Sequence, residues 1–68
     1  MATKEQYAII DSIHKALRNN GYSFTESFNY MARHGVLSPN KQEVRKGVTT
    51  KYLKAVLREA EKERKVYQ

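Results

Sequence analysis

The chain has 68 residues and no cysteine, so we expect a single domain over residues 1–68 without disulfides or thiolate metal sites. Thirteen Lys and Arg against seven Asp and Glu leave a net charge of +6, which is typical of proteins that bind a polyanion. No apolar run reaches the ~18 residues of a membrane-spanning helix, and the N-terminus lacks a secretory signal, so we expect a cytoplasmic protein without a membrane partner.

Residues 3–19 predict a first helix. Thr3 and Gln6 have the spacing of a capping box, in which each side chain accepts from the backbone amide of the other residue. The sequence Asn-Asn-Gly that finishes at Gly21 predicts the end of the helix, because glycine readily adopts the left-handed conformation required there. The apolar residues at helical spacing, which we expect to be buried, are Ile9, Ile13, Ala16 and Leu17.

Residues 24–34 predict a second helix. Ser23 and Glu26 again have capping-box spacing, and Gly35 predicts the end of the helix. Tyr30 lies off the apolar stripe of this helix, so we expect it to be an exposed aromatic residue. The apolar residues that form the stripe, and that we expect to pack on the first helix, are Phe24, Phe28, Met31 and Ala32.

Residues 36–48 allow two interpretations. Ser38 and Pro39 suit the N-cap and the first position of a short helix. Pro39-Asn40 and Gly47 equally suit bends in an extended excursion or a small ribbon. We favour the excursion, and expect four aliphatic residues to hold its ends on the core: Val36, Leu37, Val44 and Val48.

Residues 49–65 predict a third helix, with Thr49 or Thr50 as the N-cap. Its apolar positions at helical spacing are Leu53, Val56, Leu57 and Ala60. Other faces of the helix carry a set of residues of which most are basic: Thr49, Lys51, Lys54, Arg58 and Lys62. A helix with one apolar edge and one cationic face is the form in which many proteins enter the major groove of DNA. Residues 1–32 carry equal numbers of acidic and basic side chains, so the whole positive excess lies in residues 33–68.

The middle of the chain resembles two families of DNA-binding protein. The segment IHKALRNNGYSFTESFNYMARHGV, residues 13–36, resembles the first two helices of small helix-turn-helix proteins of phage and plasmid origin. Residues 35–59 are similar to the DNA-binding unit of serine recombinases, where a basic excursion with a glycine precedes a Thr- or Ser-started helix. The resemblance implies that residues 24–34 support residues 49–62, which lie in the major groove. The chain shows no recombinase catalytic domain, and its turn is longer than a tight helix-turn-helix turn.

We therefore predict an all-α, three-helix, helix-turn-helix-like domain with an extended turn before the third helix, which binds double-stranded DNA as a small regulator such as a repressor. Arg and Lys can pair with guanine, and Thr can contact thymine or phosphate. Tyr22 and Tyr52 should be partly buried, with phosphate contact as the alternative. One copy offers an interface of the order of 600–1,000 Å², so we expect a homodimer on an inverted repeat. The candidate DNA-binding residues are Thr49, Thr50, Lys51, Lys54, Arg58, Lys41, Arg45, Lys46 and Arg33.

The sequence predicts neither catalysis nor a cofactor nor a metal site. His14 and His34 are the two imidazoles, and no Ser or carboxylate pair is spaced to build a catalytic triad with them. The competing function is a protein-interaction module that binds an acidic patch on a host enzyme, such as RNA polymerase or a nuclease, and inhibits it. Phe24, Phe28 and Tyr30 would then be its anchors. RNA binding is disfavoured because the aromatic residues are spread along the helices rather than gathered on one platform.

Overall fold

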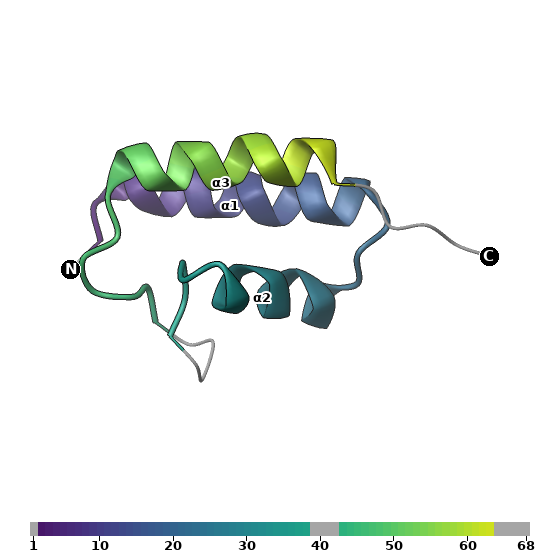
Figure 1. The fold of residues 1–68 in the computed structure, drawn as a ribbon, viewed down its shortest axis with the longest axis horizontal. Helices are drawn as coiled ribbons and strands as arrows, with labels where there is room; N and C mark the ends of the chain where they lie inside the picture. The colour runs from purple at the N-terminus through teal and green to yellow at the C-terminus, as the bar shows by residue number, and fades with distance from the viewer. Residues whose placement is uncertain (1, 39–42, 64–68) are drawn as a thin grey trace.

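The structure, a computed structural model, describes residues 2–38 and 43–63 and has three α-helices in that part of the chain. Helices α1 (Lys4–Asn19) and α3 (Thr50–Lys62) run side by side in the same direction, and α2 (Phe24–Arg33) runs in the opposite direction (Figure 1). The predicted all-α, three-helix fold is therefore confirmed. None of the described helices is both long enough and apolar enough to span a bilayer.

The helices begin where the predicted capping residues stand. The Thr3 hydroxyl accepts from the Gln6 amide at 3.1 Å, while the Gln6 side chain accepts from the Thr3 amide at 2.9 Å. Ser23 and Glu26 form the second predicted capping box, with distances of 3.0 and 3.1 Å. Thr49 is the N-cap of α3. Each cap satisfies amides of the first helical turn that have no partner within the helix.

Gly35 ends α2 and turns the chain toward the core. Its φ is +76°, a conformation that residues with a Cβ adopt at a cost. The amide of Val36 then donates back to the carbonyl of Met31 at 2.9 Å, a closure typical of helix C-termini. Because this closure reverses the chain direction, Val36 and Leu37 enter the core and are both buried.

The described residues between α2 and α3, 36–38 and 43–48, form a small antiparallel ribbon without a helical turn, which agrees with the interpretation that we favoured. An isolated antiparallel bridge joins Leu37 to Val44, and the amide of Arg45 donates to the carbonyl of Val36 at 3.0 Å. Val44 and Val48 pack against the core at partly buried positions, so all four predicted aliphatic anchors serve that role. The bend predicted at Pro39-Asn40 lies outside the described residues.

Two side-chain amides join α1 to α3, one at each end. The Gln6 side chain donates to the carbonyl of Val48, just before α3, at 3.1 Å. The Asn20 side chain donates to the carbonyls of Ala60 and Glu61, near the end of α3, at 2.9 and 3.3 Å. Both contacts require α1 and α3 to be parallel and in one register.

The core lies between α1, α3 and α2, and its buried apolar residues are Ile13, Leu17, Tyr30, Met31, Val36, Leu37, Leu53, Val56 and Ala60.

Two expectations for α2 were wrong. Tyr30, predicted to be exposed, is 3% exposed, and Phe24, predicted to be in the core, is 58% exposed. The predicted stripe assumed that α2 packs on α1 alone. The helix instead turns Tyr30 inward, where its ring lies 5.9 Å from that of Tyr22 and the charge of Glu63, at the end of α3, acts on its phenol. Phe24 is the first residue of α2, and its ring lies 5.0 and 4.8 Å from the rings of His14 and Phe28.

The amide of Asn20 gives a test of the α1–α3 register. Asn20→Ala removes a part-buried donor and should lower the free energy of unfolding by about 1 kcal/mol. Asn20→Asp should lower it further, because a carboxylate would face two carbonyl oxygens at the negative end of α3. Urea denaturation followed by circular dichroism measures both. The exposed neighbour Asn19→Ala is the control, with an expected change within about 0.5 kcal/mol; equal losses for Asn19→Ala and Asn20→Ala would contradict the contact.

Candidate nucleic-acid interface

The outward face of α3 carries a row of cations. These residues follow three- and four-residue spacing, so they share one face of the helix, opposite the buried Leu53, Val56 and Ala60. All of them are exposed. We call this row the cationic stripe, and its members are Lys51, Lys54, Arg58 and Lys62.

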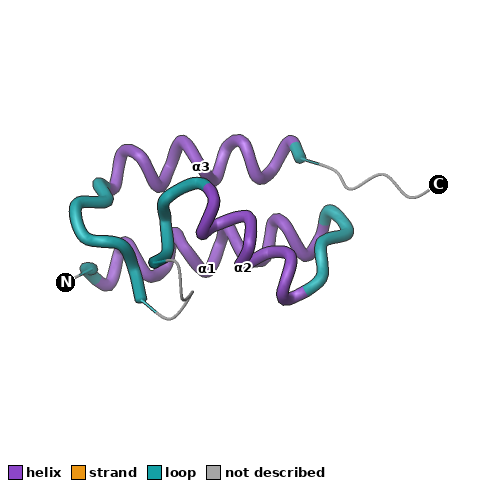
Figure 2. Tube along the Cα trace, turned by 60° about the horizontal axis from the view of Figure 1, so that its bottom comes forward, coloured by secondary structure: helices purple, strands orange, loops and turns teal. Residues whose placement is uncertain are grey.

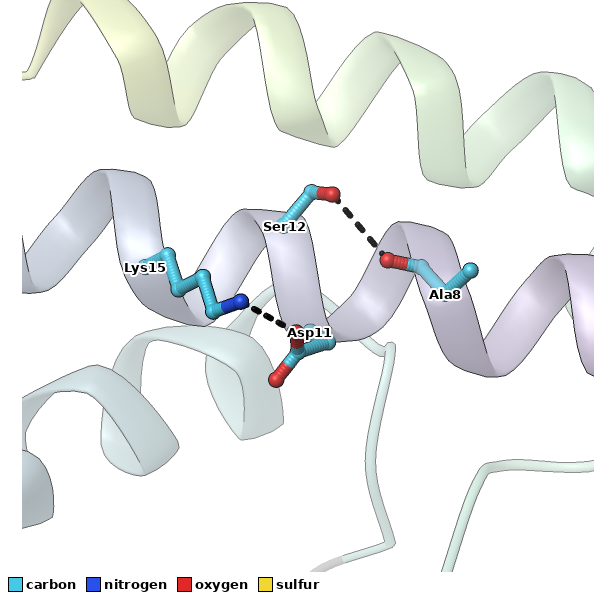
Figure 3. Close-up of polar contacts among 4 residues, drawn as sticks. All are labelled: Ala8, Asp11, Ser12 and Lys15. Carbon is cyan, nitrogen blue, oxygen red and sulfur yellow. Dashed lines mark hydrogen bonds and ion pairs between the residues drawn. The ribbon is translucent and has the colours of Figure 1, made fainter.

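No ion pair between described residues neutralises the cationic stripe. The one ion pair in the described part of the chain joins Lys15 to Asp11 on α1 at 3.1 Å (Figure 3). Lys54 and Arg58 are instead like charges four residues apart, a spacing that destabilises a helix by about 0.2–0.5 kcal/mol per pair. Arg58 and Lys62 repeat this arrangement. The alignment of the cations therefore does not stabilise α3, and it leaves a concentrated positive potential facing solvent.

Further cations lie where α3 begins. A shallow pocket of about 370 Å³ lies between the end of α2 and the start of α3, and its lining includes His34, Arg45, Lys46, Thr49 and Tyr52. The hydroxyl of Tyr52 donates to the carbonyl of His34, which fixes the end of α2 against the first turn of α3. Arg45 and Lys46 are exposed. The positive surface therefore continues from the stripe toward the ribbon and α2.

The predicted site residues do not all join this surface in the same way. The Thr49 hydroxyl accepts from the Tyr52 amide at 3.1 Å, so it is already engaged as the helix cap. Thr50 is half-buried and shares the face of Leu57, which packs against the core, so it lies beside the stripe and not on it. Arg33 is exposed in the last turn of α2. Lys41 lies outside the described residues.

The list of candidate DNA-binding residues did not include three residues of this surface. Lys62 continues the stripe four residues after Arg58, a spacing that was readable in the sequence. His34 and Tyr52 meet across the pocket at the start of α3, which depends on how the end of α2 is placed. Tyr52, expected to be partly buried, is 44% exposed. That His34 and Tyr52 meet could be found only from the fold.

Acidic residues limit the cationic surface toward the C-terminal end of α3. Glu59 and Glu61 are exposed and flank Arg58 and Lys62 on either side of the stripe. A polyanion that approached the last turns of α3 would therefore meet both signs of charge. Lys51 and Lys54 in the first turns have no acidic neighbour within four residues along the helix. The N-terminal half of α3 is thus the part best suited to contact a polyanion.

A second exposed surface lies at the junction of α1 and α2. Tyr7 and His14 are seven residues apart on one face of α1, and the His14 ring lies 5.0 and 5.1 Å from the rings of Phe24 and Phe28. Tyr7 is 56% exposed and Phe24 is 58% exposed. Figure 2 shows α1 and α2 together below α3 in the view. We call it the aromatic patch, and its members are Tyr7, Ile10, His14, Phe24 and Phe28.

No protein-family model, curated protein or solved structure matches the chain. The likeness to helix-turn-helix proteins and to the DNA-binding unit of serine recombinases therefore stays a prediction from the sequence. The function proposed below depends on the charge and geometry of the two surfaces themselves.

His14 couples stability to pH. Burial lowers its pKa from the ordinary value, and the positive charge of Arg18 lowers it further, while Asp11 opposes this with a smaller effect. The folded chain therefore binds the proton less readily than the unfolded chain. The stability is complete above the unfolded pKa of about 6.5 and falls as the pH is lowered through that value.

Thermal unfolding measured from about pH 7.5 down to about pH 5.5 tests this coupling, in a range where carboxylates stay ionised. The Tm of the wild type should fall over this range. His14→Phe removes the titrating group from the patch and should flatten the profile. His34→Gln is the control, because it leaves His14 in place and should keep the wild-type slope. An equally steep fall for His14→Phe would show that another group is responsible.

Proposed function

We propose that this protein binds double-stranded DNA through the cationic stripe of α3, with the first turns of the helix in the major groove. The observation that carries the proposal is the placement of Lys51, Lys54 and Arg58 on one exposed face without an ion-pair partner among the described residues. Their mutual repulsion is relieved when a polyanion lies against them, because phosphates supply the missing negative charge.

The dimensions of α3 suit this role. A helix of 13 residues is about 20 Å long, and with its side chains it fits a major groove about 12 Å wide. Lys and Arg in its first turns can pair with the O6 and N7 atoms of guanine, which supplies sequence discrimination. Arg45, Lys46 and Arg33 lie beside the start of α3 or at the end of α2, where contacts to phosphates would orient the helix.

Regulation by occlusion is the simplest consequence of such binding. A small DNA-binding domain on a promoter excludes other proteins from the same duplex without needing an activity of its own. The competing function, inhibition of a host enzyme through exposed aromatic anchors, loses Tyr30 as an anchor because Tyr30 is buried. Its remaining anchors are Phe24 and the half-buried Phe28, which lie within residues 1–32, a part of the chain without net positive charge for an acidic partner.

Charge reversal on the stripe separates DNA binding from folding. In the double variant Lys54→Glu and Arg58→Glu, the new Glu at position 58 lies four residues before Lys62, a favourable spacing for a helix. The variant should therefore be at least as stable as the wild type. It should nevertheless lose retention of duplex DNA at ~0.1 M salt, because two contacts become repulsive. Fluorescence anisotropy with a labelled duplex and urea denaturation measure the two properties.

The matched control is Lys4→Glu with Arg18→Glu on α1, which lowers the net charge by the same amount outside the stripe. This control should retain most of the affinity. If it loses as much affinity as the α3 variant, binding follows net charge alone and α3 is not the reading helix. A double variant of α3 that still retains the duplex would contradict the proposal directly.

Salt dependence counts the phosphate contacts. If six to eight cations of this surface meet phosphates, log K should fall against log salt with a slope of about −5 to −7. Lys46→Ala removes one exposed cation from the ribbon and should make the slope shallower by about one. Titrations from about 50 to about 300 mM salt measure the slope. A wild-type slope near −1 would mean that the stripe does not follow the phosphate backbone.

A further inference from the structure

Two uncharged side chains stand among the exposed residues of α3. Eight residues of this helix are exposed, and six of them are charged; the other two are Tyr52 and Ala55. They are three residues apart, so they are neighbours on the helix surface. The hydroxyl of Tyr52 donates to the carbonyl of His34, which fixes the position of its ring. We call Tyr52 and Ala55 together the apolar flank.

The apolar flank lies directly beside the cationic stripe. At about 100° per residue, Ala55 is about 40° from Lys51 around the helix, and Tyr52 lies about 60° beyond Ala55. Lys54 lies on the other side of the stripe, about 40° from Arg58. Along the helix axis Ala55 is about 6 Å from Lys51, which is less than two base-pair steps of about 3.4 Å. A duplex that faces the stripe therefore also faces Ala55.

The chemistry of the major groove identifies what the apolar flank would contact. The base edges there present donors and acceptors of hydrogen bonds, together with the C5-methyl group of thymine. Lysine and arginine suit the acceptor atoms of guanine, whereas the methyl of alanine and the face of an aromatic ring suit the thymine methyl. The outward surface of α3 therefore fits a thymine close to a guanine.

We propose that Ala55 determines specificity by contacting the C5-methyl group of a thymine, with the ring of Tyr52 beside it, within about two base pairs of the base that Lys51 contacts. The contact rests on the DNA binding proposed above. It assigns to Ala55 a thymine contact that the sequence alone left to threonine. The Thr49 hydroxyl is engaged as the helix cap, and Thr50 is half-buried beside the stripe.

The test uses the full chain and duplexes that differ by one methyl group. Selection from a pool of random duplexes first gives the preferred site. Each thymine of that site is then replaced singly by deoxyuridine, which lacks the C5-methyl group and keeps every hydrogen-bonding atom. Fluorescence anisotropy should show that one such replacement lowers the affinity of the wild type about fourfold, as expected for the loss of one buried methyl-sized group.

Variants at position 55 show whether Ala55 makes this contact. Ala55→Gly removes the methyl group of the protein, so it should bind the thymine and deoxyuridine duplexes equally well. Ala8→Gly is the matched control, because it is the same substitution at an exposed position of α1 (Figure 3 shows Ala8), and it should keep the wild-type ratio of affinities. Glycine weakens a helix in both variants, which thermal unfolding measures. If Ala55→Gly does not fold, Ala55→Gln decides, because glutamine favours a helix and its amide takes the place of the contact.

Each outcome separates the thymine contact from the proposed function. A wild type that binds thymine and deoxyuridine duplexes equally, or a selection that returns no preferred site or a site without thymine, overturns the contact. A position-55 variant that keeps the wild-type ratio, or an Ala8→Gly control that loses it, also overturns the role of Ala55. In all of these cases the duplex is retained and the proposed function stands. If the wild type retains no duplex from the pool, the proposed function fails, and the thymine contact fails with it.

Discussion

The parallel packing of α1 on α3 fixes which side chains α3 presents to solvent. Gln6 holds the chain just before α3, and Asn20 holds carbonyls near its end, so the helix can neither slide nor rotate without loss of a hydrogen bond. A rotation by one residue, about 100°, would bring Lys54 toward the core and expose Leu53. The cationic stripe is therefore a consequence of how α1 is capped and ended, and not of α3 alone.

Tyrosines set the place of α2 relative to α3. Tyr22 contacts Tyr30 at one end, with its hydroxyl 3.4 Å from Glu63, and Tyr52 donates to the carbonyl of His34 at the other. Burial, and after it the negative charge of Glu63, raises the pKa of Tyr30, so its phenol remains neutral between the helices. The hydrogen bond from Tyr52 to His34 holds the end of α2 close to the start of α3. That placement brings the ribbon cations beside the stripe.

Local sequence patterns predicted where the helices begin and end. The contacts between helices decided which residues are buried and which surface residues meet. Both capping boxes, the glycine helix ends and the apolar edge of α3 are set by residues within four positions of one another, so the sequence alone located them. Tyr30 and Phe24 were misplaced because their burial depends on a second helix that periodicity does not locate. The same limit applies to the site. Lys51, Lys54 and Arg58 share a face by spacing alone, whereas the meeting of Tyr52 with His34 requires the folded chain.

If the chain binds DNA as proposed, its small size limits the affinity of one copy. A domain of this size covers only a modest area of duplex, so one copy would bind weakly at physiological salt. The first turns of α3 would then supply most of the contacts, because Lys51 and Lys54 have no acidic neighbour within four residues along the helix, whereas Glu59 and Glu61 flank its last turns.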